Sequence, residues 1–529
     1  MRPSTRLKLG ALMIACGIFA VHAVVPGHPG PPNDPGSSAS SPRIPRTWDD
    51  TVLAALEVPL ADPVGSPKHA SSDYYYKLPV RPIYKSYPIY APGHEPPGYR
   101  DWLRKQEPQV IWDDAGHRPP LQTEADWIAA GEIAFDAPTG FEGVRAVVRA
   151  PDVQDPKWWA GVGARFAKDG TLPGYRYVIR KKGQIEVGSL SCASCHDRVM
   201  PDGTVIKGAQ GSFPFDRTLG LFFRTAPPQA LTEVRLGNYR LYGAPWLKPD
   251  PQARVLQMSL EEIASAHDAI PGGVLARHRA SVFYPVQVPD LIGVKDRRYL
   301  DRTGLQQHRG IVDLMRYAAL NQGGDDLASF DGFVPDDPGD FKQLPAPDKL
   351  DPSRTQADRY SDEQLYALAL YVYSLEPPPN PNRVDGVAQQ GQKVFGREGC
   401  AGCHTPPLYT NNKLTLAEGF IPPPGAEQKY DILPISVGTD PGLATKTRRG
   451  TGYYKVPSLK GVWYRSMFGH SGWCATLEDW FDPRRTRDDY VPTGFKSYDA
   501  KSYAVKGHPF GLNLSAEDKR ALIAFLRTL

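Results

Sequence analysis

The chain has 529 residues, a formal net charge of +4 and 54 prolines, and 41% of its residues are hydrophobic. This length exceeds one ordinary core and predicts several domains, while so many prolines predict irregular stretches around a smaller helical core. The charge excess is small and comes with no basic run, so it gives no reason to expect a nucleic-acid partner.

The N-terminus has the pattern of an export signal. Residues 1–8 carry three basic side chains, residues 9–21 are apolar, and residues 21–23 offer small side chains where signal peptidase cuts. Cleavage would remove residues 1–23 and leave a periplasmic or otherwise exported protein. Two alternatives stay open: residues 13–16 loosely resemble a lipoprotein cleavage box, and an uncleaved segment over 9–25 would contact the membrane as a short anchor.

A flexible linker over 24–45 precedes a Pro/Tyr-rich extension over 46–120. The linker consists of Pro, Gly and Ser with few apolar residues. In residues 73–93 prolines recur too often for a helix or a central strand, while tyrosines supply large apolar faces. We expect an extended strap over a domain surface, and the alternative is a platform for a partner.

Two predicted helices share an ending. Residues 124–135 and 387–395 both have helical apolar spacing, and both end in G-x-x-x-F. Between the first helix and Cys192, residues 144–148 and 175–190 alternate apolar and polar positions. This alternation predicts a small β-hairpin inserted after the first helix.

The motif C-x-x-C-H occurs twice, as residues 192–196 and 400–404. In this motif two thiols add across the vinyl groups of one haem, and the adjacent imidazole becomes an axial ligand of its iron. A zinc site needs no histidine directly after the second cysteine, and a thioredoxin-like motif would follow a strand. Two copies therefore predict two covalently bound c-type haems, attached through Cys192, Cys195, Cys400 and Cys403, with His196 and His404 as proximal ligands.

A predicted helix that follows each C-x-x-C-H motif also repeats. Residues 361–375 align without a gap on residues 515–529, and both begin with a serine suited to N-capping. The order helix, C-x-x-C-H, helix predicts cytochrome c-type domains over 121–377 and 380–529, joined by a short proline-rich linker. The expected fold is mainly α, with a small β-hairpin insertion in the first domain and the Pro/Tyr-rich extension before it.

The sixth ligand of each iron decides the chemistry, because a strong protein ligand gives an electron-transfer haem and an open position admits peroxide or oxygen. His508 is the candidate for the second haem, with His470 and Met467 as competitors. The equivalent position in the first domain is Arg354, which cannot ligate iron. This difference predicts a closed second haem and a reactive first haem. Other candidate ligands for the first haem are Met200, Met258, His267, His278, His308 and Met315.

The second domain resembles the bacterial di-haem cytochrome c peroxidase superfamily, which includes the methylamine-utilisation di-haem protein and the di-haem rubber oxygenases. The resemblance covers most of 387–529, and over the first domain it is thinner. It is carried by residues 391–395, CAGCH, 454–462, 467–472, 476–480 and the last helix, and in the first domain by 131–136, CASCH and 294–304.

The resemblance implies that the C-terminal haem takes electrons from a small donor protein, a cytochrome or a cupredoxin, and that the N-terminal haem does the chemistry. It makes His508 the distal ligand where many members use methionine, and it places His470 near the region between the haems. Calcium between the domains is left open.

Two segments depart from the family pattern. Where many members have Phe-Trp-Asp, this chain has residues 299–301, so Tyr299 would replace the tryptophan relay and Asp301 stays a candidate. No Asn-Pro-x-Glu-Met segment is found, and Asp325 or Asp326 would supply the acid and base for O–O cleavage instead.

Three functions are weighed. The first is peroxide reduction at the first haem, with electrons relayed through the second. The second is an oxygen-dependent, rubber-oxygenase-like reaction on an apolar substrate, favoured by the long region before the first haem motif. The third is a non-catalytic electron carrier with both haems six-coordinate.

Overall fold

A computed structural model describes residues 43–142, 145–146, 148–277, 279–322, 327–333, 335 and 358–529. The expected export signal over 1–23 lies outside these residues, as does most of the linker over 24–45. Within the described ranges, no helix combines the length and the apolar character that a membrane crossing needs.

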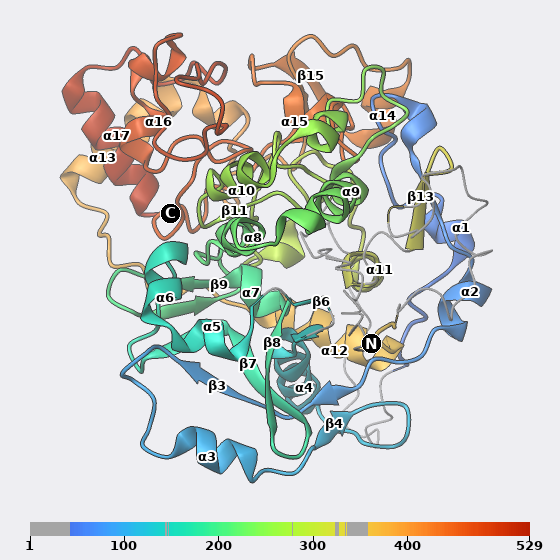
Figure 1. Cartoon of the computed structure of the whole chain (residues 1–529). Helices are drawn as coiled ribbons and strands as arrows, with labels where there is room; N and C mark the ends of the chain where they lie inside the picture. Colours follow the sequence, from blue (N-terminus) through green and yellow to red (C-terminus); the bar gives the residue numbers. More distant parts are fainter. Residues whose placement is uncertain are drawn as a thin grey trace, which may run out of the picture.

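The helices lie over the whole chain (Figure 1). They are α1 (Asp50–Leu53), α2 (Ser72–Lys77), α3 (Tyr99–Arg104), α4 (Glu124–Asp136), α5 (Ala150–Gln154), α6 (Pro156–Val162), α7 (Cys192–His196), α8 (Phe215–Arg224), α9 (Leu231–Tyr242), α10 (Leu260–Asp268), α11 (Ile311–Gln322), α12 (Asp362–Ser374), α13 (Gly386–Arg397), α14 (Ala426–Tyr430), α15 (Gly442–Thr445), α16 (Leu477–Trp480) and α17 (Ala516–Arg527).

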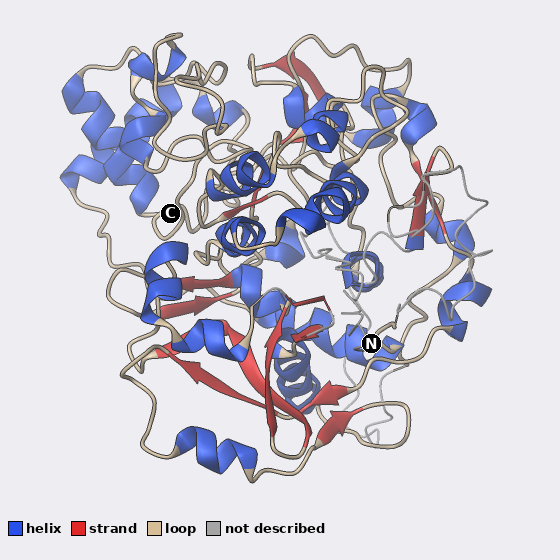
Figure 2. Ribbon diagram, in the orientation of Figure 1, coloured by secondary structure: helices blue, strands red, loops and turns tan. Residues whose placement is uncertain are grey.

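The strands are mostly short, and the two longest, β7 and β8, lie in the lower half of the molecule (Figure 2). They are β1 (Pro67–His69), β2 (Ile83–Tyr84), β3 (Ser86–Tyr90), β4 (Val110–Trp112), β5 (Gly140–Glu142), β6 (Arg145–Ala146), β7 (Thr171–Lys181), β8 (Gln184–Ser189), β9 (Asp197–Val199), β10 (Val205–Lys207), β11 (Val274–Leu275), β12 (Val286–Gln287), β13 (Ala328–Phe330), β14 (Leu414–Leu416), β15 (Ile432–Ser436) and β16 (Tyr453–Lys455).

Two helix pairs, α4 with α12 and α13 with α17, pack in the same way. A Cβ added at Gly131 of α4 would lie 2.0 Å from the carbonyl oxygen of Ala367 in α12. A Cβ added at Gly391 of α13 would lie 1.9 Å from the carbonyl oxygen of Ala521 in α17. Ala367 and Ala521 occupy matching positions of the predicted repeat, so the repeat in sequence is a repeat in packing. The domain boundaries at 121–377 and 380–529 remain a prediction.

The mainly α expectation is only partly correct, because the structure is mixed. Strands β7 and β8 form the predicted hairpin, but they belong to a five-stranded sheet in the order β3-β7-β8-β5-β6. The alternation of residues 175–190 showed the hairpin, whereas the outer strands are too short to be recognised from alternation alone.

The Pro/Tyr-rich extension is also more regular than expected. Its strand β3 pairs antiparallel with β7 at the sheet edge, and Pro88 is tolerated there because an edge strand needs fewer backbone donors. Tyr87 and Ile89 are buried. Residues 73–77, expected to be extended, lie in α2, since the Ser71 side chain caps the helix and the first proline follows only after it. The extension is therefore part of the folded core.

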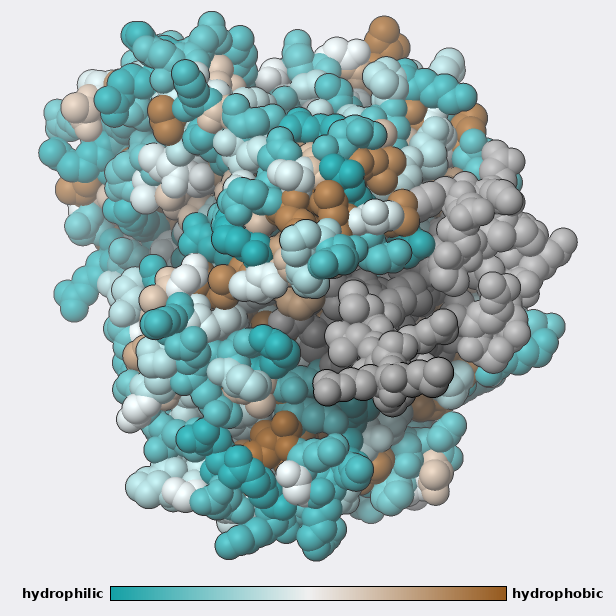
Figure 3. Space-filling view, in the orientation of Figure 1, coloured by the Kyte–Doolittle hydropathy of each residue, from teal (hydrophilic) through white to brown (hydrophobic). Residues whose placement is uncertain are grey.

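The largest apolar cluster runs through both halves of the chain. It includes Phe135 and Tyr371 of the first helix pair and also Trp473 and Cys474. A second, smaller cluster lies between α13 and α17. On the face visible in Figure 3, hydrophilic residues predominate and the hydrophobic ones form separate patches, so most of the apolar surface is turned inward.

Candidate functional site

The second C-x-x-C-H motif follows α13 through a turn. Gly399 has a φ of +74°, which glycine adopts without strain, and residues Cys400–Gly402 then form a 3-10 turn. The Nδ1 of His404 lies 3.1 Å from the carbonyl oxygens of Tyr409 and Pro457. A carbonyl only accepts, so Nδ1 carries the proton and Nε2 keeps its lone pair for a metal. Burial lowers the pKa of His404 and keeps the imidazole neutral.

A cavity of about 220 Å³ lies beside this motif, and Cys400, Cys403, His404 and His508 all line it. The ring centroids of His404 and His508 are 6.4 Å apart. Two imidazoles that share one metal, each through a bond of about 2 Å, have centroids about 6 Å apart. The thiols, the two imidazoles and the predominantly apolar lining therefore fit a covalently bound haem.

Arg485 holds the loop that carries His508. Its Nε donates to the Trp480 carbonyl at 2.7 Å, and its Nη1 donates to the carbonyls of Val505 at 2.5 Å and Gly507 at 3.0 Å. Its Nη2 donates to the His508 carbonyl at 2.8 Å. His508 has a φ of +47°, a conformation that costs free energy in a residue other than glycine. The buried guanidinium offsets this cost by fixing the loop backbone.

The competitors of His508 are engaged elsewhere. His470 lines the same cavity, but its Nε2 shares a hydrogen bond of 3.1 Å with the Tyr454 hydroxyl, and the two rings stack at 4.2 Å. Burial lowers the pKa of His470 to about 3. Met467 packs against the large apolar cluster. His470 is thus placed as a wall residue of the cavity.

The first motif forms α7, capped by the Ser191 side chain. His196 is fully buried, and neither of its ring nitrogens makes a well-formed hydrogen bond within the described residues. Burial lowers the pKa of His196 to about 3, although the Pro289 backbone acts in the opposite direction, so the imidazole is neutral and can offer a lone pair to a metal. A cavity of about 10 Å³ lies beside Cys192 and Phe135, between α11 and α12. The donor set fits a haem, whereas the space beside this cysteine is much smaller than at the second motif.

Two of the candidate sixth ligands for the first haem have both ring nitrogens in use. His267 shares hydrogen bonds with Asp216 at 3.1 Å and with Asn238 at 3.0 Å. His308 shares hydrogen bonds with the Arg297 carbonyl at 3.2 Å and with the Tyr373 hydroxyl at 2.7 Å. Met258 and Met315 are buried in the large apolar cluster, and Met200 packs in a small one beside Tyr464. His278 and Arg354 lie outside the described residues.

The candidate catalytic residues 299–301 do not line the cavity beside the second motif, and residues 299 and 300 are connected to it through Lys455. The Lys455 Nζ donates to the carbonyls of Tyr299 and Leu300 at 3.0 Å, and Lys455 lines the cavity. The Tyr299 side chain packs away from the cavity, and its hydroxyl donates to the Tyr430 carbonyl. The Asp301 carboxylate accepts four hydrogen bonds within residues 303–306, so it holds a loop. Asp325 and Asp326 lie outside the described residues.

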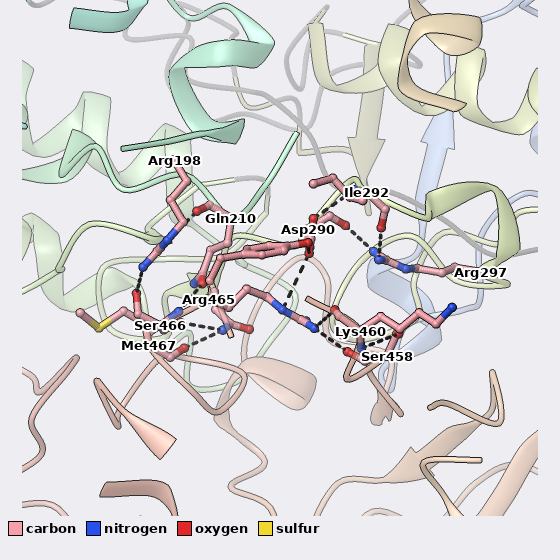
Figure 4. A network of polar contacts seen from close by, with 12 residues as sticks. Arg198, Gln210, Asp290, Ile292, Arg297, Ser458, Lys460, Arg465, Ser466 and Met467 are labelled. Atoms are coloured by element: carbon pink, nitrogen blue, oxygen red, sulfur yellow. Dashed lines mark hydrogen bonds and ion pairs between the residues drawn. The ribbon is translucent and has the colours of Figure 1, made fainter. Parts of the chain in front are cut away.

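A polar network connects the two motif regions (Figure 4). Arg198, two residues after His196, donates to the Ser466 hydroxyl at 3.2 Å, and Ser466 donates through its backbone to Gln210 at 3.0 Å. Arg465, which lines the second cavity, lies 3.8 Å from the Asp290 carboxylate. Sequence reasoning missed these residues and Arg485. Arg198, two residues after His196, had a signal in its position next to a motif, whereas Arg485 lies 23 residues before His508 and had none.

Comparisons with known proteins give limited similarity. No protein-family model matches the chain. Over 168 residues the chain is 28% identical to the cytochrome-c peroxidase IdrP1 of Pseudomonas sp. (strain SCT), and this match covers 28% of the chain and 41% of that protein. The chain therefore spans less than half the length of this relative.

Two solved structures overlap with the chain at 18% identity. One is Kuenenia stuttgartiensis hydrazine synthase pressurised with xenon. The overlap covers 34% of this chain and 59% of the hydrazine synthase chain, at a TM-score of 0.21. The other is a MauG-like protein associated with microbial copper homeostasis. The overlap covers 32% of this chain and 56% of the MauG-like chain, also at a TM-score of 0.21. At these scores neither overlap defines the fold.

Proposed function

We propose that the chain is an exported di-haem c-type cytochrome that reduces hydrogen peroxide at the haem of Cys192 and Cys195, with electrons relayed through the haem of Cys400 and Cys403. The partial similarity to a cytochrome-c peroxidase supports this class of reaction. A small donor protein, a cytochrome or a cupredoxin, would supply the electrons.

The observation that carries the proposal is an asymmetry between the two motifs. His404 and His508 line one cavity with ring centroids 6.4 Å apart, so both imidazoles would hold the iron of a haem bound there and would leave no position for peroxide. Near the first motif, His267 and His308 have both ring nitrogens in hydrogen bonds. A haem ligated by His196 would then keep a position for peroxide.

Each side chain has a defined task in this scheme. When bound, haem supplies an iron that carries one electron at a time and, with an open position, binds peroxide. His404 offers Nε2 because two carbonyls hold the proton on Nδ1. Lys455 ties residues 299–300 to the cavity of the second motif, and Arg198 ties the first motif to residue 466. These contacts would hold the two centres at a fixed separation, as electron relay requires. The conversion of one peroxide to two waters consumes two electrons and two protons.

Peroxide turnover with a reduced small cytochrome c as donor tests the proposal. We expect the double variant Cys192→Ser, Cys195→Ser to lose peroxide reduction while it keeps the spectrum of the second haem. The double variant Cys400→Ser, Cys403→Ser should lose donor-dependent turnover while it keeps ligand binding at the first haem. Full activity in the first double variant would sink the assignment of the reactive centre.

A further inference from the structure

Arg277 is an arginine buried in the first cytochrome c-type domain. Its side chain lies on the segment that follows β11, and the residue is 4% exposed. None of its three guanidinium nitrogens has a hydrogen-bond partner within the described part of the chain. Burial lowers the pKa of the Arg277 guanidinium far below its ordinary value, which is the mark of an uncompensated charge.

The position of Arg277 relates it to the first haem motif. Its guanidinium lies 3.8 Å above the ring of Phe215, and the backbone N–H of the preceding Ala276 donates to Asp216 at 3.1 Å. The segment before Phe215 packs on the motif so tightly that a Cβ at Gly211 would lie 2.1 Å from the Cys195 carbonyl oxygen. Residues 211–215 thus contact Cys195 at one end and the Arg277 guanidinium at the other.

A second donor without a hydrogen-bond partner in the described ranges, the Tyr175 hydroxyl of β7, belongs to a ring that packs against the same residues 211–215. The ring of Tyr175 packs on Phe213 at 4.6 Å between centroids, and the buried Tyr175 hydroxyl has no hydrogen-bond partner in the described residues. The residue before Tyr175 packs on the motif, since a Cβ added at Gly174 would lie 2.5 Å from the Cα of Ser194. Arg277 and Tyr175 therefore converge on residues 213–215 from two different elements.

Burying the Arg277 guanidinium and the Tyr175 hydroxyl without acceptors costs folding free energy unless an anion accepts their hydrogen bonds. Arginine stays protonated in proteins, and an unpaired buried charge costs several kcal/mol. Asp216 forms no hydrogen bond to the Arg277 guanidinium in the described residues, and its oxygens instead accept from the Ala276 N–H and share a hydrogen bond with His267. Phe215 covers one face of the guanidinium, so its N–H groups are left for a planar acceptor in the plane of the fork, the geometry of a carboxylate.

We propose that Arg277 is a carboxylate-binding residue of the first cytochrome c-type domain, with the Tyr175 hydroxyl as a second donor, and that the ligand is a propionate of the haem attached at Cys192 and Cys195. This inference rests on the attachment of a haem there, but not on peroxide reduction. The same chemistry would recognise a small organic acid from solution, and the experiment separates the two sources.

The test is a spectroelectrochemical titration of the holoprotein that reads the two haems separately, without peroxide. A nearby positive charge favours the reduced state, so Arg277→Gln should lower the potential of the first haem and leave that of the second unchanged. Arg277→Lys, which keeps the charge, should restore most of the difference. The exposed Arg104, paired with Asp101, provides the control Arg104→Gln, which should change neither potential.

Acetate is the probe for a ligand from solution. If the wild-type potential responds to acetate saturably, and Arg277→Gln abolishes that response without its own shift, the ligand is a free carboxylate and the propionate assignment is overturned. If neither potential changes in Arg277→Gln and acetate has no effect, the site itself is overturned. Should Arg277→Gln fail to accumulate, Tyr175→Phe should lower the first potential by a smaller amount, and an unchanged potential would contradict the proposal.

Discussion

At the scale of single residues, the cavity beside the second motif depends on neighbours that orient its two histidines. The proton on His404 is set by two carbonyls, and the backbone of His508 is set by Arg485. His404 and His508 were found from the sequence because haem chemistry demands imidazoles near the motif. Arg485 was not, since arginine has many ordinary roles and only the folded loop shows its four carbonyl partners.

We predict that Arg485→Lys loosens the ligation of the second haem. A lysine keeps the charge but has a single nitrogen, whereas Arg485 reaches four carbonyls with three nitrogens, and each lost charged hydrogen bond is worth about 1.5–3 kcal/mol. A high-spin fraction should appear in the electron paramagnetic resonance spectrum of the second haem. The neighbouring Arg484 is exposed and pairs with Asp482, so Arg484→Lys is the matched control and should leave the spectrum unchanged. An unaltered spectrum in Arg485→Lys would show that Arg485 does not position His508.

At the scale of elements, the repeated helix pairs carry the fold. The gapless alignment of 361–375 on 515–529 predicted equivalent helices, and the structure shows the same glycine-to-alanine contact in both pairs. The sheet could be foreseen only in part. The hairpin of β7 and β8 alternates clearly, but β3 is interrupted by Pro88 and recognisable only through its partner. Long-range pairing of this kind leaves no local signal in a single sequence.

We predict that Gly391→Ala destabilises the C-terminal unit by about 1–3 kcal/mol, because the added methyl group would meet the Ala521 carbonyl oxygen at 1.9 Å. The same helix contains its control. A Cβ at Gly396 meets nothing within 4 Å, so Gly396→Ala should be neutral or stabilise by up to about 1 kcal/mol. Denaturant unfolding of the holoprotein, followed by circular dichroism, measures both. Equal midpoints for the two variants would contradict the close helix contact.

At the scale of the whole molecule, buried neutral histidines make the protein sensitive to acid. Burial lowers the pKa of His308 from 6.5 to about 4 and that of His470 to about 3. Below pH 6.5 the unfolded chain binds protons that the folded chain refuses. The unfolding free energy therefore falls as the pH drops from about 6.5 towards 4.

We predict that His308→Gln reduces this acid dependence by up to about 3 kcal/mol between pH 6.5 and 4, since one pKa unit corresponds to about 1.4 kcal/mol. Denaturant unfolding at a series of pH values measures the slope. The exposed His117 supplies the control His117→Gln, which should keep the wild-type slope. An unchanged slope in His308→Gln would show that His308 accepts its proton in the folded state.

The central claim concerns the whole molecule: one closed haem and one reactive haem in a single chain. A cyanide titration of the oxidised holoprotein, followed by electron paramagnetic resonance, tests it most directly. We predict that one haem per chain binds cyanide, while the haem of Cys400 and Cys403 keeps the low-spin signal of two imidazole ligands. If neither haem binds cyanide, the protein is an electron carrier with both irons closed. If both bind it, His508 is not a ligand and the asymmetry does not exist.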